Sequence, residues 1–240
     1  MTADTPLAKT HLSVDCTVLG FDGKRLEVLL VRRTGEEGGR RFHDMKLPGS
    51  LIWEDEELDS AARRVLTELT GLKHVPLTQF RAFGSKDRTK DPKDVHWLEH
   101  AQKARVGRIV TVAYIALVKI DRILVREMEG TEALWVPVDA VPPLAFDHNE
   151  IISAALSYER TLASRDPSVL FDLLPRKFTA TALRNLYEVV FGRRLNPSNF
   201  YKQMARMPYV VALDEFERGV DHRAARYYRF DKKQYDIIRL

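Results

Sequence analysis

The stretch LPGSLIWEDEELDSAARRVLTELTGL, residues 47–72, decides the fold of this 240-residue chain. Within it, residues 61–69 place apolar side chains at helical spacing. Such spacing predicts an amphipathic helix with one face toward a core. An ordinary amphipathic helix accounts for this periodicity, but it does not account for the polar residues and glycines that flank it. The apolar positions are Ala61, Ala62, Val65, Leu66 and Leu69.

The complete string resembles the signature of Nudix pyrophosphohydrolases. That signature reads Gly, five residues, Glu, seven residues, then Arg-Glu-apolar-x-Glu-Glu-x-Gly-apolar, and it forms a loop, a helix and a loop. Aligned on Gly71 and Leu72, the chain keeps Glu56 and Arg64 and has Ser50 at the leading glycine. The resemblance implies an α+β protein that begins with a Nudix-type α/β/α sandwich around a mixed sheet.

The same alignment shows that metal-binding carboxylates are missing. Val65 and Leu69 occupy two of the three metal positions, and only Glu68 is kept. Mg²⁺ prefers hard oxygen ligands, and its charge stabilises the leaving oxygen in pyrophosphate hydrolysis. We therefore expect no metal, no cofactor and no catalytic residue, with Glu56, Glu68 and Arg64 tying the loop to the helix. The alternative is a Nudix hydrolase of nucleoside diphosphate derivatives that uses Glu56 and Glu68 as a reduced metal site.

Charge is distributed unevenly along the chain. Residues 165–240 contain 15 Lys and Arg against 9 Asp and Glu, whereas residues 1–164 contain 23 against 25. A cationic C-terminal third suits attraction to a phosphate backbone, although a solvated basic surface explains the charge alone equally well. Without an apolar run of about 18 residues or a basic region before an apolar one, we expect no membrane span, no secretory signal and a cytoplasmic protein. Cys16 lies in an apolar alternating run and is expected to be a buried thiol.

Hydrophobic patterning predicts the elements of the first domain, residues 1–164. Alternation favours half-buried strands, and a long β-prone apolar run favours a strand buried on both faces. A charged insertion at 86–107 contains a helix-like segment. The expected elements are strands at 11–20, 26–31, 109–118 and 132–138, a turn at 21–24, a loop at 34–41 and a helix at 150–162.

Residues 165–240 predict a second domain. A linker or docking segment at 165–175 precedes a helix that starts near Thr179 and stops at Gly192. A second helix starts at Asn196. Short strands at 209–213 and 225–230 flank the polar segment 214–224. This order of two helices and a basic hairpin is typical of a winged helix-turn-helix.

Residues 171–179, FDLLPRKFT, and 183–188, LRNLYE, carry a more specific resemblance. With the degenerate Nudix segment, they look like the NrtR/AraR group of Nudix-related transcriptional regulators, over residues 11–231. The resemblance implies a ligand-sensing Nudix domain, a winged helix that binds double-stranded operator DNA, and a homodimer. Effectors in this group include ADP-ribose and pentose-type sugars, so a sugar, a sugar phosphate or an ADP-ribose-like molecule remains open here.

The second helix of a helix-turn-helix presents its N-terminal part to base edges, while cationic side chains hold phosphates. We therefore expect DNA contacts from this helix and from the wing that follows it. If the basic residues were scattered and not gathered on one face, the domain would instead be a protein-docking module. The candidate DNA-binding residues are Ser198, Asn199, Lys202, Gln203, Arg206, Arg218, His222, Arg223 and Arg226.

Four arginines of the first domain are candidate ligands for an anionic effector. Arg32 and Arg33 end a strand beside the Nudix segment, and Arg88 and Arg108 flank the insertion. A guanidinium binds phosphate or carboxylate through paired hydrogen bonds. Salt-bridged or surface arginines are the alternative explanation. His148 is expected to be structural.

Overall fold

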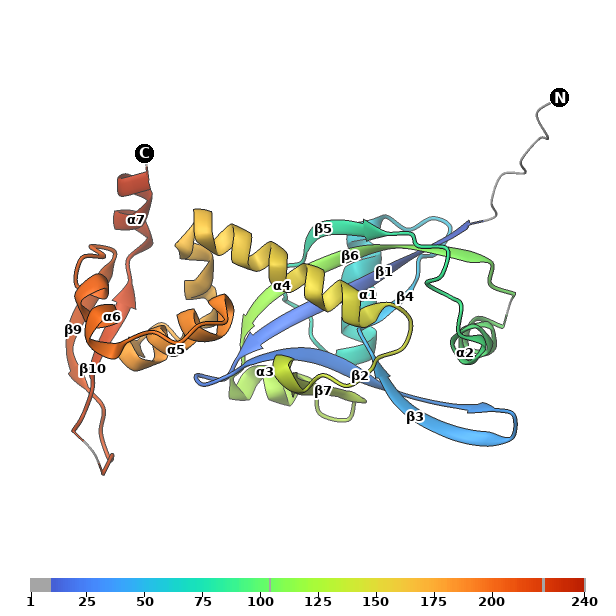
Figure 1. Cartoon of the computed structure of the whole chain (residues 1–240), viewed down its shortest axis with the longest axis horizontal. Coiled ribbons are helices and arrows are strands. Elements are labelled where there is room, and N and C mark those ends of the chain that lie inside the picture. The colour runs from blue at the N-terminus through green and yellow to red at the C-terminus, as the bar shows by residue number, and fades with distance from the viewer. Residues whose placement is uncertain (1–9, 104, 222, 240) are drawn as a thin grey trace. The chain divides into compact units, whose positions relative to one another are not determined.

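The computed structural model describes residues 10–103, 105–221 and 223–239 (Figure 1). The chain divides into two compact units. Among the described residues, no helix is both long enough and apolar enough to cross a membrane. The expected division after residue 164 falls near the end of helix α4, His148–Arg165, whereas the compact units divide within that helix. The first unit contains the residues up to Val18, Val28–Ala116 and Arg122–Ala155; the second contains Leu19–Glu27, Leu117–Asp121 and the residues from Leu156 onward.

A seven-stranded sheet supports the first unit. Its main path runs β3-β2-β1-β6-β5, with β4 paired to β1 and β7 paired to β2. The apolar run at 109–118 forms β6, which has a neighbour on each side, so the expectation of an interior strand is confirmed. The strands are β1 (Thr10–Phe21), β2 (Leu26–Glu37), β3 (Arg40–Lys46), β4 (Gly49–Leu51), β5 (Thr78–Phe83), β6 (Arg108–Lys119) and β7 (Ala133–Pro137).

The expectation of a loop at 34–41 was wrong, because these residues form the end of the β2–β3 hairpin. Gly38 and Gly39 both have positive φ, 55° and 77°, which is the backbone that a tight two-residue hairpin turn requires. Across the ladder Glu36 pairs with Arg41 and Glu37 with Arg40. Opposite charges on facing residues stabilise an exposed antiparallel pair.

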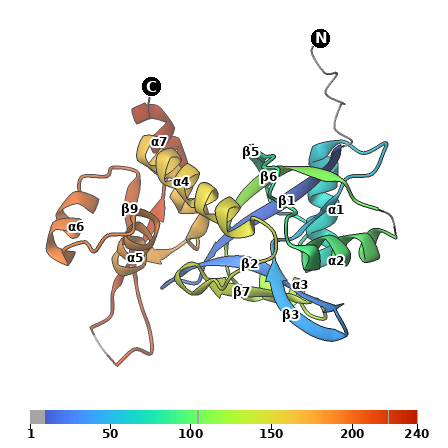
Figure 2. The same cartoon turned by 45° about the vertical axis from the view of Figure 1, so that its right-hand side comes forward.

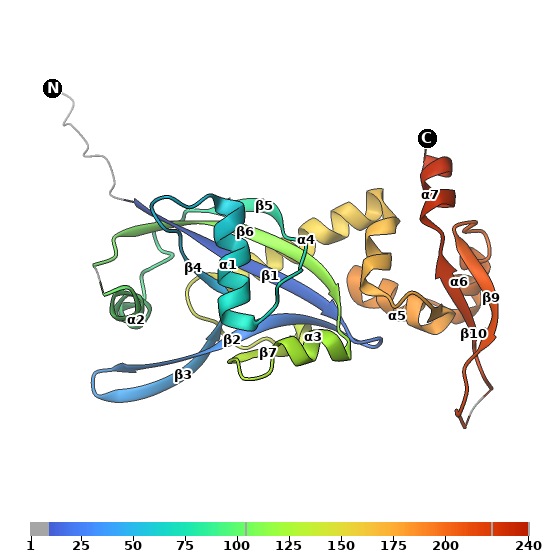
Figure 3. The same ribbon diagram turned by 180° about the vertical axis from the view of Figure 1, so that it is seen from behind.

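Helices cover both faces of this sheet. Helix α1, Leu58–Thr70, crosses one face in Figure 3, and the first half of α4 lies on the other face in Figure 1. Helix α1 ends at Gly71 with φ 79°, where an added Cβ would lie 2.0 Å from the carbonyl oxygen of Glu127. The helix-like part of the insertion is α2, Pro92–Gln102, and a short helix α3 spans Arg122–Glu127.

The second unit contains the expected winged helix (Figure 2). Its elements are β8 (Phe178–Thr179), α5 (Ala180–Phe191), α6 (Pro197–Met204), β9 (Val210–Phe216), β10 (Arg226–Phe230) and α7 (Lys232–Arg239), and its sheet has the order β8-β10-β9.

Apolar side chains from most elements of this unit form one core. The segment expected as a linker or docking piece is the 3-10 helix η2, Pro167–Leu173, and it contributes Leu170 and Phe171 to that core. Phe171 stacks on Phe230 of β10 with the ring centroids 4.2 Å apart. Residues 165–175 therefore dock into the winged helix.

Candidate functional site

An arginine binds Glu56 and Glu68, the two acidic residues that the chain keeps at positions of the Nudix signature. Arg64 donates two hydrogen bonds to Glu56, at 2.7 and 2.6 Å, and one to Glu68 at 3.2 Å. The hydrogen bonds from Arg64 lower the pKa of Glu56 below its ordinary value. The expectation that these residues tie the loop to the helix is confirmed. Within the described parts of the chain, no three His, Cys, Asp or Glu side chains are grouped closely enough to hold a metal ion.

A buried polar network lies behind this segment, centred on Asp15 of β1. Arg88 donates to Asp15 at 2.6 Å and forms an ion pair with Asp147 at 2.9 Å. The Nδ1 atom of His148 accepts from the backbone N–H of Leu47 at 2.9 Å, which places the imidazole proton on Nε2, 3.4 Å from Asp15. Burial disfavours the carboxylate, but His148 and Arg88 outweigh it and hold the pKa of Asp15 far below its usual value. The structural role expected for His148 is confirmed.

A cavity of about 30 Å³ opens beside this network. Lys46 donates to the carbonyl oxygens of Leu47 and Gly49, at 3.2 and 2.6 Å, and burial lowers the pKa of its ammonium group to about 8. At Gly49 an added Cβ would overlap the carboxylate of Asp15, so only glycine allows β4 to approach β1 this closely. The polar side chains around the cavity are Ser13, Asp15, Lys46, Ser50, Arg88 and His148.

A second buried network attaches α2 to the β2–β3 hairpin. Arg33 makes a bidentate pair with Asp44, both bonds 2.7 Å, and donates to Asp94 of α2 at 2.6 Å. Its guanidinium also lies 5.1 Å from the ring centroids of Phe42 and Trp97. A desolvated arginine between aromatic faces and carboxylates is strongly held.

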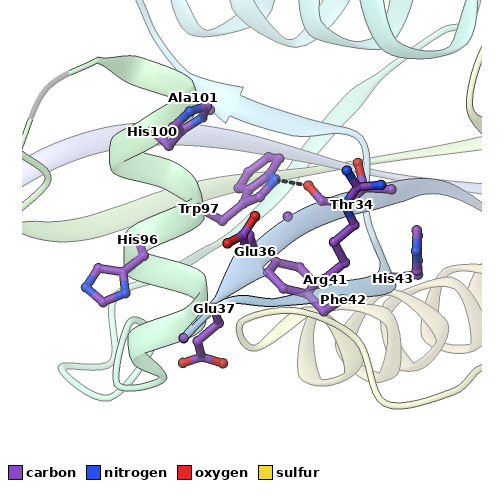
Figure 4. Close-up of a pocket in the computed structure, with 12 residues that line it drawn as sticks. Thr34, Glu36, Glu37, Arg41, Phe42, His43, His96, Trp97, His100 and Ala101 are labelled. Carbon is purple, nitrogen blue, oxygen red and sulfur yellow. Dashed lines mark hydrogen bonds between the residues drawn. The ribbon is translucent and has the colours of Figure 1, made fainter.

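Between the hairpin and α2 lies an open cleft of about 710 Å³. Figure 4 shows the indole of Trp97 directed toward β2, where its N–H donates to the carbonyl oxygen of Thr34 at 3.0 Å. Phe42 comes from the hairpin side, and His96 and His100 come from α2. Small-molecule sites in proteins occupy about 300–1,000 Å³ and combine aromatic walls with a few polar groups. The cleft has both properties.

The structure distributes the four expected ligand arginines over different places. Arg32, which is exposed, and the buried Arg33 line an open pocket of about 510 Å³ beside β7. Arg88 lines the polar cavity, and Arg108 is exposed and donates to the carbonyl oxygen of Gly84 at 2.8 Å. Arg33 and Arg88 thus take part in internal ion pairs.

In the winged helix, α6 presents a polar face. Pro197 occupies its first turn, and the Asn196 side chain caps it by accepting from the backbone N–H of Asn199 at 3.1 Å. Phe200 and Met204 are buried, which turns the other side of the helix outward. The side chains of α6 and its C-terminal extension that are both expected to contact DNA and exposed are Ser198, Asn199, Lys202, Gln203 and Arg206.

The hairpin after α6 carries exposed cations. Arg218, Arg223 and Arg226 are all exposed, and Arg226 donates to the carbonyl oxygen of Leu213 while lying 5.9 Å from the ring of Phe216. Arg223 and Arg226 line an open pocket of about 570 Å³, together with Thr179, Tyr201 and other residues. His222 lies outside the described residues.

Several residues of these sites carry little sequence signal. Asp15 is the one acidic residue of a largely buried strand, and a buried charge is usually paired. Phe42 and Trp97 stand in charged segments, and no periodicity predicts that they share one cleft. Asp94 belongs to the charged insertion, where an acidic side chain is ordinarily expected to be exposed to solvent.

Comparisons with known proteins match each of the two parts of the chain to a protein family. The NUDIX domain family matches residues 9–155, and the NrtR DNA-binding winged helix domain family matches residues 170–230. The chain is 27% identical over 230 residues to the ADPR responsive transcriptional repressor NtrR of Acinetobacter baylyi, covering 94% of this chain and 84% of that protein.

Two solved structures share the fold over most of the chain. The NrtR protein of Shewanella oneidensis in complex with a 27mer DNA has a TM-score of 0.64 and 25% identity, covering 91% of this chain and 93% of that one. A MutT/nudix family protein from Enterococcus faecalis has a TM-score of 0.64 at 22% identity, covering 94% and 88%. The chain therefore belongs to the Nudix family, and its Nudix domain is followed by a DNA-binding winged helix domain of the NrtR type.

Proposed function

We propose that this protein is a transcriptional repressor whose winged helix binds operator DNA and whose Nudix domain senses ADP-ribose. The observation that carries the proposal is the exposed polar face of α6 next to the exposed arginines of the wing, on a domain of the NrtR type. The Acinetobacter baylyi relative is named for its response to ADPR, and the Shewanella oneidensis relative has been solved with DNA. The working division is residues 1–164 for sensing and 165–240 for DNA binding.

On α6, Asn199 and Gln203 supply the amides that pair with adenine in the major groove. Lys202 and Arg206 supply cations for phosphates, as do the wing arginines. Two such winged helices in a homodimer would contact two half-sites separated by about one helical turn or a multiple of it. A palindromic operator follows from that symmetry.

The large cleft between the β2–β3 hairpin and α2 is the proposed place of the effector. Its volume suits a nucleotide-sized ligand, and its aromatic and histidine side chains offer stacking surfaces and hydrogen-bond donors. In this proposal the insertion forms one wall of the sensor. The hydrolase alternative is disfavoured because Arg64 already engages both carboxylates that would have to bind metal.

The experiment starts with the full-length protein and fragments of genomic DNA, from which bound fragments are selected and sequenced. Fluorescence anisotropy then compares the recovered duplex with a scrambled duplex at several salt concentrations, with and without ADP-ribose. We expect preference for the recovered duplex, a steep fall of affinity with salt, and release by ADP-ribose. Equal, salt-insensitive binding to both duplexes would reject the DNA-binding part, and binding that ADP-ribose leaves unchanged would reject the sensing part.

A further inference from the structure

The small cavity beside Asp15 contains polar atoms that the fold leaves without hydrogen bonds. Among the described residues, neither Ser13 Oγ nor Arg88 Nε has a hydrogen-bond partner, although both atoms are fully buried. Leaving a buried donor or acceptor unpaired costs about 1–3 kcal/mol. Because Ser13 and Arg88 both line the cavity, a bound molecule placed there would satisfy them.

The charges around the cavity favour a neutral polar group over an anion. Of the arginines that the structure describes, only Arg88 lines the cavity, and its charge is already shared between the carboxylates of Asp15 and Asp147. Lys46 directs its ammonium group to two backbone carbonyl oxygens. A phosphate would therefore meet the carboxylate of Asp15, while the charges of Arg88 and Lys46 are already engaged. A hydroxyl, in contrast, accepts from a guanidinium N–H and also donates to an oxygen.

The size of the cavity narrows the choice further. A water-sized group needs about 10–15 Å³ of such space, so a cavity of about 30 Å³ admits two. Two adjacent hydroxyls form the vicinal diol of a pentose. Trp97 lines both this cavity and the large cleft, so the diol end of a longer ligand has the rest of its binding site next to it.

We propose that this cavity recognises the vicinal diol of a pentose, with Ser13 and Arg88 as specificity-determining residues. The inference rests on the proposed response to ADP-ribose, because the terminal ribose of that molecule carries such a diol. A free pentose would offer the same chemistry from a second source.

The test is isothermal titration calorimetry on the full-length protein with ADP-ribose, ADP, D-ribose and 2-deoxy-D-ribose. ADP lacks the terminal ribose, and 2-deoxy-D-ribose lacks the 2-hydroxyl and therefore the 2,3-diol. The test variant is Ser13→Ala, and the matched control is Thr17→Val on the same strand, since Thr17 also buries an unpaired hydroxyl but does not line the cavity. Circular dichroism checks that both variants are folded.

We expect Ser13→Ala to weaken ADP-ribose binding about three- to tenfold, because one neutral hydrogen bond is lost, and Thr17→Val to leave it unchanged. ADP should bind more weakly than ADP-ribose. If the wild-type protein binds ADP-ribose and Ser13→Ala binds it equally well, the cavity holds water only and the inference fails while the proposed function stands. If the wild type ignores ADP-ribose but binds D-ribose in a Ser13-dependent way and rejects 2-deoxy-D-ribose, the diol site stands and the ADP-ribose response fails. Binding of none of the four compounds overturns both.

Discussion

A buried carboxylate in the second unit predicts a pH-dependent stability. Glu159 of α4 is 6% exposed, and its Oε2 atom has no hydrogen-bond partner among the described residues. Burial raises the pKa of this carboxyl group from its ordinary 4.5 to about 7. The folded chain therefore binds a proton here more tightly than the unfolded chain does.

The sign of the effect follows from this difference in pKa. Below pH 4.5 the group is protonated in both states and carries no penalty. Between pH 4.5 and about 7, the carboxyl group ionises in the unfolded chain but stays protonated in the folded chain. Ionisation stabilises the unfolded state, so the free energy of unfolding falls as the pH rises. A pKa difference of about 2.5 units, at about 1.36 kcal/mol per unit, limits the loss of unfolding free energy above pH 7 to at most about 3–4 kcal/mol.

The substitution Glu159→Gln removes the titrating group and keeps the shape of the side chain. We expect the variant to be more stable than the wild type at pH 8, by about 1–3 kcal/mol, and to lose this advantage at pH 5. Urea denaturation followed by circular dichroism at both pH values measures the difference. Glu150→Gln is the matched control, because Glu150 lies on the same helix and is exposed.

The informative quantity is the change, between pH 5 and pH 8, in the stability difference between variant and wild type. Other carboxylates contribute equally to both proteins and cancel. A difference that is the same at both pH values, or that matches the Glu150→Gln control, would refute the reasoning that Glu159 is a buried, unpaired acid.

Three further predictions concern the Nudix segment, the winged helix and the insertion. With Mg²⁺ and ADP-ribose the protein should release no AMP above a blank in a chromatographic assay, and turnover that Glu68→Gln abolishes would contradict this. In fluorescence anisotropy at several salt concentrations, Arg223→Ala should weaken binding to all duplexes and reduce the slope of log affinity against log salt by about 0.9. Asn199→Ala should instead cost about 1–3 kcal/mol of binding free energy on the operator only. The reverse pattern would show that Asn199 contacts phosphate and Arg223 contacts a base. Asp94→Asn should lower the free energy of unfolding by about 1.5–3 kcal/mol, because it removes a charged partner from the buried Arg33. An unchanged urea midpoint would show that Asp44 alone is enough to compensate the charge of Arg33.

Much of the fold could be predicted from local patterns in the sequence. The string 47–72 indicated the Nudix segment because its residues act within one loop and one helix, and the buried run at 109–118 indicated an interior strand. The apolar stripe of the winged helix and the capped start of α6 are likewise local. The β2–β3 hairpin was missed although Gly38–Gly39 is a turn signal, because its charged flanks resemble a loop until the two strands pair.

The roles of the buried arginines depend on contacts that lie far away in the chain. Arg33 donates a hydrogen bond to Asp94, which lies 61 positions away in the sequence, and Arg88 donates one to Asp15, which lies 73 positions away. A guanidinium in a sequence is equally suited to an effector and to a carboxylate of its own protein, since both offer the same hydrogen-bond acceptors. The sequence alone determined the family signature, the two-domain order and the exposed polar face of α6, because these rest on neighbouring residues. Only the tertiary structure decided which charges are already paired and which polar atoms still lack a partner, because the folding of distant segments sets that pairing.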